Sequence, residues 1–320
     1  MGEKYSTSLT ELSLYDDELA DEDILSLRHM TKLTRLFINS DGIKDLSPLG
    51  SLGNLTTLSL SGAQVKDLSP LSELSSLSIL ILDLKYLDDI TPLAELISLT
   101  ELHVQNSNIS DFTPLSGLVN LRKLQISSDN NIDITPLSGL INLTELYLGP
   151  TEDIAPLSNL TNLSELIIWS ERPDIAPLSS LTNLTVLEVH IPTSDVTPLA
   201  GLVNLESLAL FRSQVGDLAP LSGLINLRYL ILWESQISDI SPLSTLTNLA
   251  VLDLSINQIS NIEPLATLSN LTYLSLHRNQ VSDLSALSGL ENLEELNLEH
   301  NDMITDWSPV AHVPQVWGRN

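Results

Sequence analysis

The sequence contains no cysteine and has few basic and few aromatic residues. The missing cysteines exclude disulfide bonds, thiolate zinc sites and cysteine nucleophiles. Lysine and arginine number 14 against 41 aspartates and glutamates, which gives a formal net charge of −27. This balance argues against binding to nucleic acids, which requires a basic surface, and against docking on an anionic membrane.

Long apolar runs are also missing. No stretch approaches 18 consecutive apolar residues, so no segment is expected to insert into a membrane. No apolar run follows the first four residues, so a signal peptide is not expected either. Hydrophobic residues make up 42% of the chain and aromatic residues only 4%. This composition predicts a folded core built almost entirely from leucine, isoleucine and valine.

A short phrase close to Asp-(Leu/Ile)-(Ser/Thr)-Pro-Leu recurs along the chain at steps of 20 to 23 residues. Its proline, replaced once by alanine, lies at Pro48, Pro70, Pro92, Pro114, Pro136, Pro156, Pro177, Pro198, Pro220, Pro242, Pro264, Ala286 and Pro309. A second phrase, Leu-x-x-Leu-x-Leu, keeps the same phase and opens at Leu9, Leu33, Leu55, Leu77, Leu99, Leu121, Leu143, Leu163, Leu184, Leu205, Leu227, Leu249, Leu271 and Leu293. This periodicity predicts a leucine-rich repeat solenoid.

One coil shows how the repeat is expected to fold. Leu58 and Leu60 share one face of a short strand, while Thr57 and Ser59 share the other. A single strand cannot bury its leucines, so the coils are expected to stack into a parallel sheet with a polar concave face. Pro70 suits the start of a short turn of helix on the convex side. The predicted fold is α/β, mostly parallel β with short 3-10 or helical convex turns, in a right-handed, curved solenoid of about 14 coils.

The phase of the repeat also divides the chain. The expected segments are an N-terminal tail (1–8), the solenoid (9–305), with an atypical first coil (9–32) and shortened coils (143–204), and a C-terminal capping segment (306–320). Trp307 and Trp317 in the capping segment are expected to cover the leucines of the last coil, because the end coils of solenoids need such covers.

Aspartates in the turns explain much of the negative charge. Twelve occupy the turn position of the repeat, where a carboxylate can accept backbone N–H groups, and an asparagine takes a thirteenth place. They are Asp45, Asp67, Asp89, Asp111, Asp133, Asp153, Asp174, Asp195, Asp217, Asp239, Asp283 and Asp306, with Asn261. A polyanionic binding face is therefore not required. Eight acids within the first 23 residues are interpreted as a solvated edge, since they lack the spacing of a calcium loop.

Several asparagines match the sugar-acceptor motif Asn-x-(Ser/Thr). We interpret them as structural, because the repeat places an asparagine directly before the first leucine of each strand. They are Asn54, Asn142, Asn162, Asn183 and Asn270.

The 22-residue period, the two phrases and an Asn-x-Ile step between them resemble the internalin-type bacterial leucine-rich repeat. The coil over 249–264 matches best, with Ile259 in place, and the resemblance covers residues 9–310. It implies a secreted or cell-surface scaffold that binds a protein on its concave face. It also implies that an asparagine after the strand satisfies backbone groups of the turn. The asparagines in this place are Asn257, Asn279 and Asn301.

The chain departs from the internalin pattern at both ends. No helical cap precedes Leu9, no immunoglobulin-like domain follows the repeats, and no wall-sorting signal is present. The array is therefore interpreted as a piece of a longer secreted or surface protein, with a free-standing cytoplasmic protein as the alternative.

Aromatic residues on the expected concave face mark the candidate binding site. Solvent-facing strand positions should be polar, yet Trp169 and Trp233 fall there beside other large apolar groups, rimmed by Glu145, Glu165 and Arg212. This composition is typical of an interaction hot spot. The alternative is that the aromatic residues only cover turns made irregular by the shortened coils. The predicted binding residues are Tyr147, Ile167, Trp169, Glu188, His190, Phe211, Tyr229, Ile231 and Trp233.

Catalysis is not expected. Glu188 and His190 are neighbours on one strand face and could do acid–base work, but no nucleophile elbow, phosphate loop or His-Glu-x-x-His motif accompanies them. The predicted function is a monomeric, non-enzymatic scaffold without cofactor or metal, which binds a protein partner through a central aromatic patch. The alternatives are a structural spacer or surface-array element without a specific ligand, and a carbohydrate-binding face on which Trp169 and Trp233 stack against sugar rings.

Overall fold

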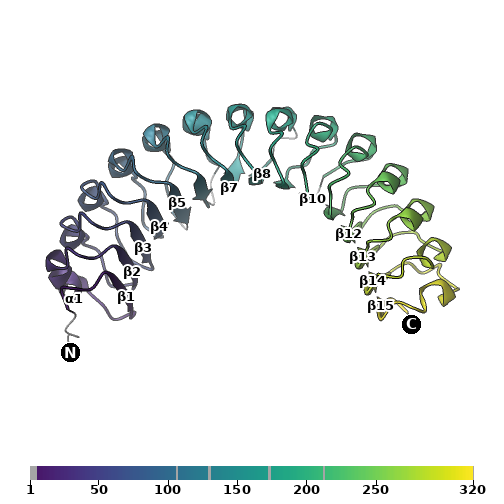
Figure 1. Ribbon diagram of the computed structural model, residues 1–320, viewed down its shortest axis with the longest axis horizontal. Coiled ribbons are helices and arrows are strands. Elements are labelled where there is room, and N and C mark those ends of the chain that lie inside the picture. The colour runs from purple at the N-terminus through teal and green to yellow at the C-terminus, as the bar shows by residue number, and fades with distance from the viewer. Residues whose placement is uncertain (1–5, 106, 129–130, 172–173, 212, 320) are drawn as a thin grey trace. The chain divides into compact units, whose positions relative to one another are not determined.

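The computed structural model describes residues 6–105, 107–128, 131–171, 174–211 and 213–319. They belong to two units, Met1–Leu163 and Ser164–Asn320. Each unit is a stack of coils, and in each coil a strand lies on one side and a short helix on the other (Figure 1). Within the described ranges, no helix is both long and apolar enough to cross a membrane.

The strands of the first unit pair in parallel and in chain order. They are β1 (Glu11–Tyr15), β2 (Arg35–Asn39), β3 (Thr57–Ser61), β4 (Ile79–Asp83), β5 (Glu101–Gln105), β6 (Lys123–Ile126) and β7 (Glu145–Thr151). The helices are α1 (Asp21–Ile24) and the 3-10 helices η1 (Leu25–His29), η2 (Ser47–Leu49), η3 (Ser69–Leu71), η4 (Thr91–Glu95), η5 (Thr113–Gly117), η6 (Thr135–Gly139) and η7 (Ala155–Asn159).

The second unit repeats the arrangement, again with parallel neighbours. Its strands are β8 (Glu165–Ser170), β9 (Val186–His190), β10 (Ser207–Phe211), β11 (Tyr229–Trp233), β12 (Val251–Asp253), β13 (Tyr273–Ser275), β14 (Glu295–Asn297) and β15 (Gln315–Trp317). Its 3-10 helices are η8 (Ala176–Ser180), η9 (Thr197–Leu199), η10 (Ala219–Leu221), η11 (Ser241–Thr245), η12 (Glu263–Thr267), η13 (Ser285–Leu287) and η14 (Ser308–Val310).

Alternation along each strand separates the core from the outer face of the sheet. Leu58 and Leu60 of β3 are fully buried, while Thr57, Ser59 and Ser61 of the same strand are partly exposed. The parallel register brings equivalent residues opposite one another from strand to strand, so the leucines form buried columns. Proline lies in the first turn of nearly every 3-10 helix described, as at η3. The predicted leucine-rich repeat architecture is confirmed.

The N-terminal acids do more than form a solvated edge. Asp21 begins the one-turn helix α1, and its carboxylate accepts the backbone N–H groups of Lys44 and Asp45 at 2.8 and 3.0 Å. Asp23 accepts the N–H of Ala20 at 3.0 Å. Acidic residues favour the first turn of a helix because they offset its free N–H groups. The sequence pattern did not predict this helix.

The C-terminal segment adds a strand that the sequence analysis did not predict. Strand β15 pairs with β14, and Leu298 donates its N–H to the carbonyl of Trp317 at 3.0 Å. Val310 and Val313 are buried, whereas Trp307 and Trp317 stay partly exposed. In this segment the buried side chains are therefore the two valines, and strand β15 pairs with the edge of β14. The two tryptophans, expected to cover the leucines, are only partly buried.

Each turn aspartate accepts a hydrogen bond from the backbone N–H two residues later. The distances are 2.8–2.9 Å at all twelve positions, and Asn261 makes the same bond at 2.9 Å. The predicted capping role is confirmed. At the positions named next, these bonds favour the ionised form and lower the aspartate pKa. The lowered pKa values are those of Asp67, Asp89, Asp111, Asp133 and Asp195, mainly through the Ser or Thr hydroxyl, and of Asp239, Asp283 and Asp306, mainly through the backbone N–H.

A folded-state pKa below the unfolded value of about 3.9 makes the turns sensitive to acid. The stabilisation is present above the unfolded pKa and is lost as the pH falls through the lower folded pKa. We expect the urea midpoint to decrease between pH 5 and pH 3, with a smaller decrease for Asp89→Asn. That variant keeps an acceptor, as Asn261 does, but cannot be protonated. Equal decreases in both proteins would contradict the prediction.

Two rows of asparagines tie successive coils together. In one row, the residue before the first strand leucine donates its side-chain amide to a carbonyl of the preceding coil at 2.8–2.9 Å. Its members are Asn54, Asn120, Asn142, Asn162, Asn204, Asn226, Asn248, Asn270 and Asn292. Four of them match the sugar-acceptor motif, and their amides have the structural role that the sequence analysis predicted.

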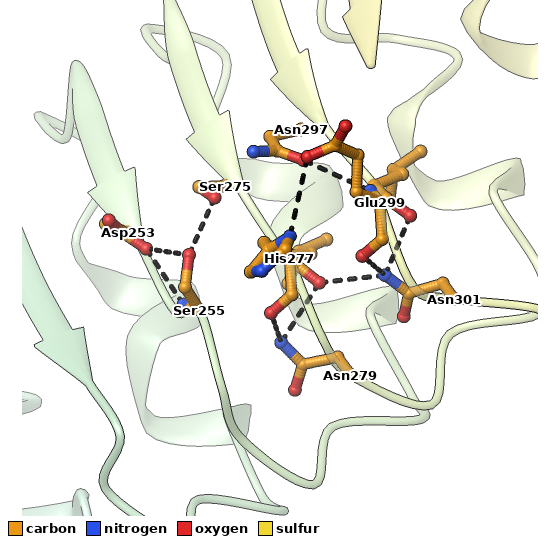
Figure 2. A network of polar contacts seen from close by, with 10 residues as sticks. Asp253, Ser255, Ser275, His277, Asn279, Asn297, Glu299 and Asn301 are labelled. Carbon is orange, nitrogen blue, oxygen red and sulfur yellow. Dashed lines mark hydrogen bonds and ion pairs between the residues drawn. The ribbon is translucent and has the colours of Figure 1, made fainter. Parts of the chain in front are cut away.

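The second row is the buried asparagine ladder, formed by Asn257, Asn279 and Asn301 in the turns after β12, β13 and β14. Figure 2 shows Asn279 and Asn301. Asn279 is 9% exposed; its amide donates to the carbonyls of Leu254 and Leu276 at 2.9 and 3.1 Å, and its oxygen accepts the N–H of Ile259 at 2.9 Å. Each asparagine thus satisfies backbone groups of its own turn and of the preceding one, as the internalin resemblance implied.

Candidate functional site

An aromatic stack lies on the outer face of the second unit. Trp169 ends the outer row of β8, His190 ends β9 and Phe211 ends β10. The rings of Trp169 and His190 are stacked with centroids 4.5 Å apart, and those of His190 and Phe211 with centroids 4.4 Å apart. Trp169 lies opposite His190 in the register, so the strand spacing of about 4.8 Å sets the distance between the rings.

The stack is held in place by a carboxylate on the same strand. Nε2 of His190 lies 2.7 Å from Oε1 of Glu188, two residues earlier on the same face of β9. Both side chains are partly buried. This contact fixes the plane of the imidazole ring, because a hydrogen bond to a ring nitrogen lies in that plane.

Strand β11 extends the same surface. Trp233 lies opposite Phe211 in the register, and Ile231 lies opposite Ala209. Tyr229 is 50% exposed and Trp169 is 39% exposed, which is unusual for large side chains on a folded sheet. We call the set of Ile167, Trp169, Glu188, His190, Phe211, Tyr229, Ile231 and Trp233 the aromatic cluster.

The structure brings eight of the nine predicted residues together on β8 to β11. The ninth, Tyr147, lies on β7 in the first unit, where Nζ of Lys123 is 5.6 Å from the centre of its ring. Glu145 is in the first unit as well and pairs with Lys123 at 2.9 Å. Arg212, expected at the rim, lies outside the described residues.

The sequence analysis did not group the polar side chains beyond β11. The Ser255 hydroxyl donates to the Asp253 carboxylate and accepts from the Ser275 hydroxyl, and Nδ1 of His277 lies 3.7 Å from Oε2 of Glu299 (Figure 2). Burial is the main cause of a lowered pKa at His277, followed by the nearby His300 and Arg278. The His277 imidazole is therefore uncharged at neutral pH.

The cluster combines an acid–base pair with stacked aromatic rings. Glu188 and His190 form an acid–base pair, but the imidazole ring is held between two aromatic rings. In the described part of the chain, no three His, Asp or Glu side chains are grouped so that they could hold a metal ion. The groups of the cluster that are exposed to solvent are aromatic ring edges, aliphatic side chains and carboxylate oxygens.

Comparisons with known proteins agree with the fold. The family model "Leucine Rich repeats (2 copies)" matches residues 97–139, 225–267 and 269–312. A search of curated protein sequences found no match. The chain is thus a leucine-rich repeat scaffold, a class of proteins that typically bind other proteins.

A solved internalin, InlF of Listeria monocytogenes, is 35% identical to this chain, covers 87% of it and is covered over 84% of its own length, with a TM-score of 0.82. The chain belongs to the internalin family of leucine-rich repeat proteins.

Two further structures share the fold. A leucine-rich repeat protein of Leptospira interrogans is 20% identical, with coverage of 97% of this chain and 90% of that one and a TM-score of 0.82. The ectodomain of the Arabidopsis thaliana receptor kinase GASSHO1/SCHENGEN3, solved in complex with CASPARIAN STRIP INTEGRITY FACTOR 2, is 22% identical, with coverage of 85% and 37% and a TM-score of 0.72.

Proposed function

We propose that the chain is a protein-binding scaffold that recognises its partner through the aromatic cluster on β8 to β11. The main observation behind this proposal is the stack of Trp169, His190 and Phe211 at outward-facing strand positions. The same positions of β3 hold Thr57 and Ser59. Exposed aromatic groups rimmed by polar ones are typical of binding hot spots. The plant receptor ectodomain, which has the same fold, was solved in complex with CASPARIAN STRIP INTEGRITY FACTOR 2, and this supports a binding role.

The stacked geometry favours a protein partner over a sugar. A sugar ring binds by lying flat on a free aromatic face. His190 has a ring on each face, and Trp169 and Phe211 each have one face covered by it. Side chains of a protein can instead pack against the ring edges and the aliphatic groups of Ile167 and Ile231. Binding to a glycan array without binding to protein would favour the carbohydrate alternative.

We also propose that the protein acts as a monomer and is secreted or displayed on the cell surface, with the cytoplasm as the alternative. Membership of the internalin family supports this location. Fractionation of the source cells, followed by detection with an antibody against the chain, tests it. A signal confined to the cytosol would contradict the proposal.

The double variant Trp169→Ala with Trp233→Ala tests the cluster. Both side chains point away from the leucine core, so the free energy of unfolding should fall by less than about 1 kcal/mol. Removing hot-spot aromatic residues should weaken partner binding by about 2 kcal/mol or more. Immobilised wild-type and variant chains are compared for the surface proteins they retain, alongside their thermal melts.

Tyr15→Ala is the matched control, because Tyr15 is an exposed aromatic residue at the equivalent strand position of β1. We expect it to retain the partner as the wild type does. A double variant that unfolds several degrees earlier would show that the aromatic residues cover irregular turns. A double variant unchanged in both stability and binding would favour the structural-spacer alternative.

A further inference from the structure

The first unit has two aromatic residues on its outer face that contact a cation of the same unit. On β2, Cζ of Arg35 lies 5.4 Å from the centre of the Phe37 ring. The same guanidinium pairs with Glu11 of β1 at 3.4 Å. An arginine cation over an aromatic face and beside a carboxylate gains from both contacts.

A second site in that unit repeats the combination with lysine. Nζ of Lys123 on β6 lies 5.6 Å from the Tyr147 ring and 2.9 Å from the Glu145 carboxylate, both on β7. Two separate places on the outer face thus combine an aromatic ring, a glutamate and a cation from the chain itself. We call this combination the cation triad.

Among the described residues, the outer face of the second unit has the rings and the carboxylates of the triad but no lysine or arginine; Arg172 and Arg212 lie outside the described residues. No lysine or arginine occurs among the described outward-facing residues of β8 to β15. The acids at these positions are Glu165, Glu188, Asp253 and Glu295. In addition to His190, the aromatic residues at these positions are Trp169, Phe211, Tyr229, Trp233, Tyr273 and Trp317. All cation–π contacts found in the described ranges belong to the first unit.

One carboxylate lies within the aromatic cluster and another lies beside it. Glu188 lies opposite Ile167 in the register, and its Oε1 contacts His190, which leaves Oε2 for a ligand. Asp253 lies opposite Ile231, on the far side of the cluster. The pKa of Tyr273 is raised by burial and next by the Asp253 carboxylate, as expected for a surface of negative potential.

We infer that the aromatic cluster and its carboxylates bind a basic segment of the partner, whose arginine or lysine side chains complete cation triads with Glu188 and Asp253. This inference rests on the proposed function. The two carboxylates stand three strands apart, which at about 4.8 Å per strand is roughly 15 Å. The matching segment therefore has two basic residues about this far apart, with apolar residues between and next to them for the rings of the cluster.

A random-peptide phage library is the probe. Phages bound by the immobilised full chain are first depleted on the Trp169→Ala, Trp233→Ala variant, so that only cluster-dependent binders remain. We expect these binders to be enriched in arginine and lysine next to apolar residues. Cluster-dependent binders without cations would overturn the inference and leave the proposed function intact. Failure to obtain any cluster-dependent binder would count against both.

The charge requirement is then measured on a selected peptide. Replacing its arginine by citrulline, which is neutral and of similar shape, should weaken binding about tenfold. Glu188→Gln with Asp253→Asn should do the same, because both variants keep hydrogen-bond acceptors but lose the charge. Glu291→Gln is the matched control, an exposed acid of the same unit away from the strands, and should bind normally. An equal loss with Glu291→Gln would assign the effect to net charge alone and overturn the inference.

Discussion

Deletion of residues 306–320 is expected to lower the melting temperature by about 10 °C and to cause aggregation. The deletion removes the buried side chains of Val310 and Val313 and strips β15 from the edge of β14. Leu296 and Leu298, now almost fully buried, would face solvent. Each such side chain contributes about 1.5–3 kcal/mol by its burial, and a free strand edge invites pairing with other chains.

Thermal melts followed by light scattering check this prediction. Deletion of residues 1–8 is the control, because residues 6–8 are exposed, and it should leave the melt unchanged. If the shortened chain melts like the full-length protein and stays monomeric, the segment is not a cap.

Asn279→Ala is expected to destabilise the protein by about 3 kcal/mol. The substitution leaves the buried N–H of Ile259 without its acceptor. The carbonyls of Leu254 and Leu276 keep one side-chain donor each, from Asn257 and Asn301, so the loss is dominated by the orphaned N–H and the space left in the turn. Urea unfolding of wild type and variant measures the difference.

Ser107→Ala provides the matched comparison for the asparagine ladder. Ser107 occupies the equivalent turn place in the first unit and is 6% exposed, but its hydroxyl has no hydrogen-bond partner among the described residues. Removing a buried hydroxyl without a partner should leave stability unchanged or slightly higher. Equal losses in the two variants would show that the turn position tolerates no substitution, whatever its hydrogen bonds.

The repeat period makes the fold predictable to the level of single residues. Once Leu58 and Leu60 are placed inside, the period of two along the strand assigns Thr57 and Ser59 to the outer face, and parallel stacking carries the assignment to every coil. The turn aspartates are predictable for the same reason, since Asp67 and its equivalents have one role.

Features that depend on side-chain torsion angles or on local exceptions are not predictable in this way. The pattern places Trp169, His190 and Phe211 in one row, but the stacking follows from the bond between His190 and Glu188. The ladder turns place Ile256, Arg278 and His300 at positive φ, where glycine would be expected. The Ile256 N–H donates to the His277 carbonyl at 2.8 Å and the Arg278 N–H to the Glu299 carbonyl at 2.9 Å, and both bonds hold the backbone against the next coil.

Both rows of asparagines have a consequence for how such a chain can change in evolution. Every bond in them joins a coil to its immediate neighbour or to itself, as when Asn120 donates to Ile97 and Asn279 to Leu254. A gene segment that encodes one whole period of the coils with the buried ladder carries with it one donor and one acceptor for each row. Unequal crossing-over between two such segments would therefore lengthen or shorten the array while leaving every remaining junction satisfied. The number of coils and the sequence of the outer face can then vary independently of each other. Members of one family can therefore share the scaffold and differ in the surface that they present.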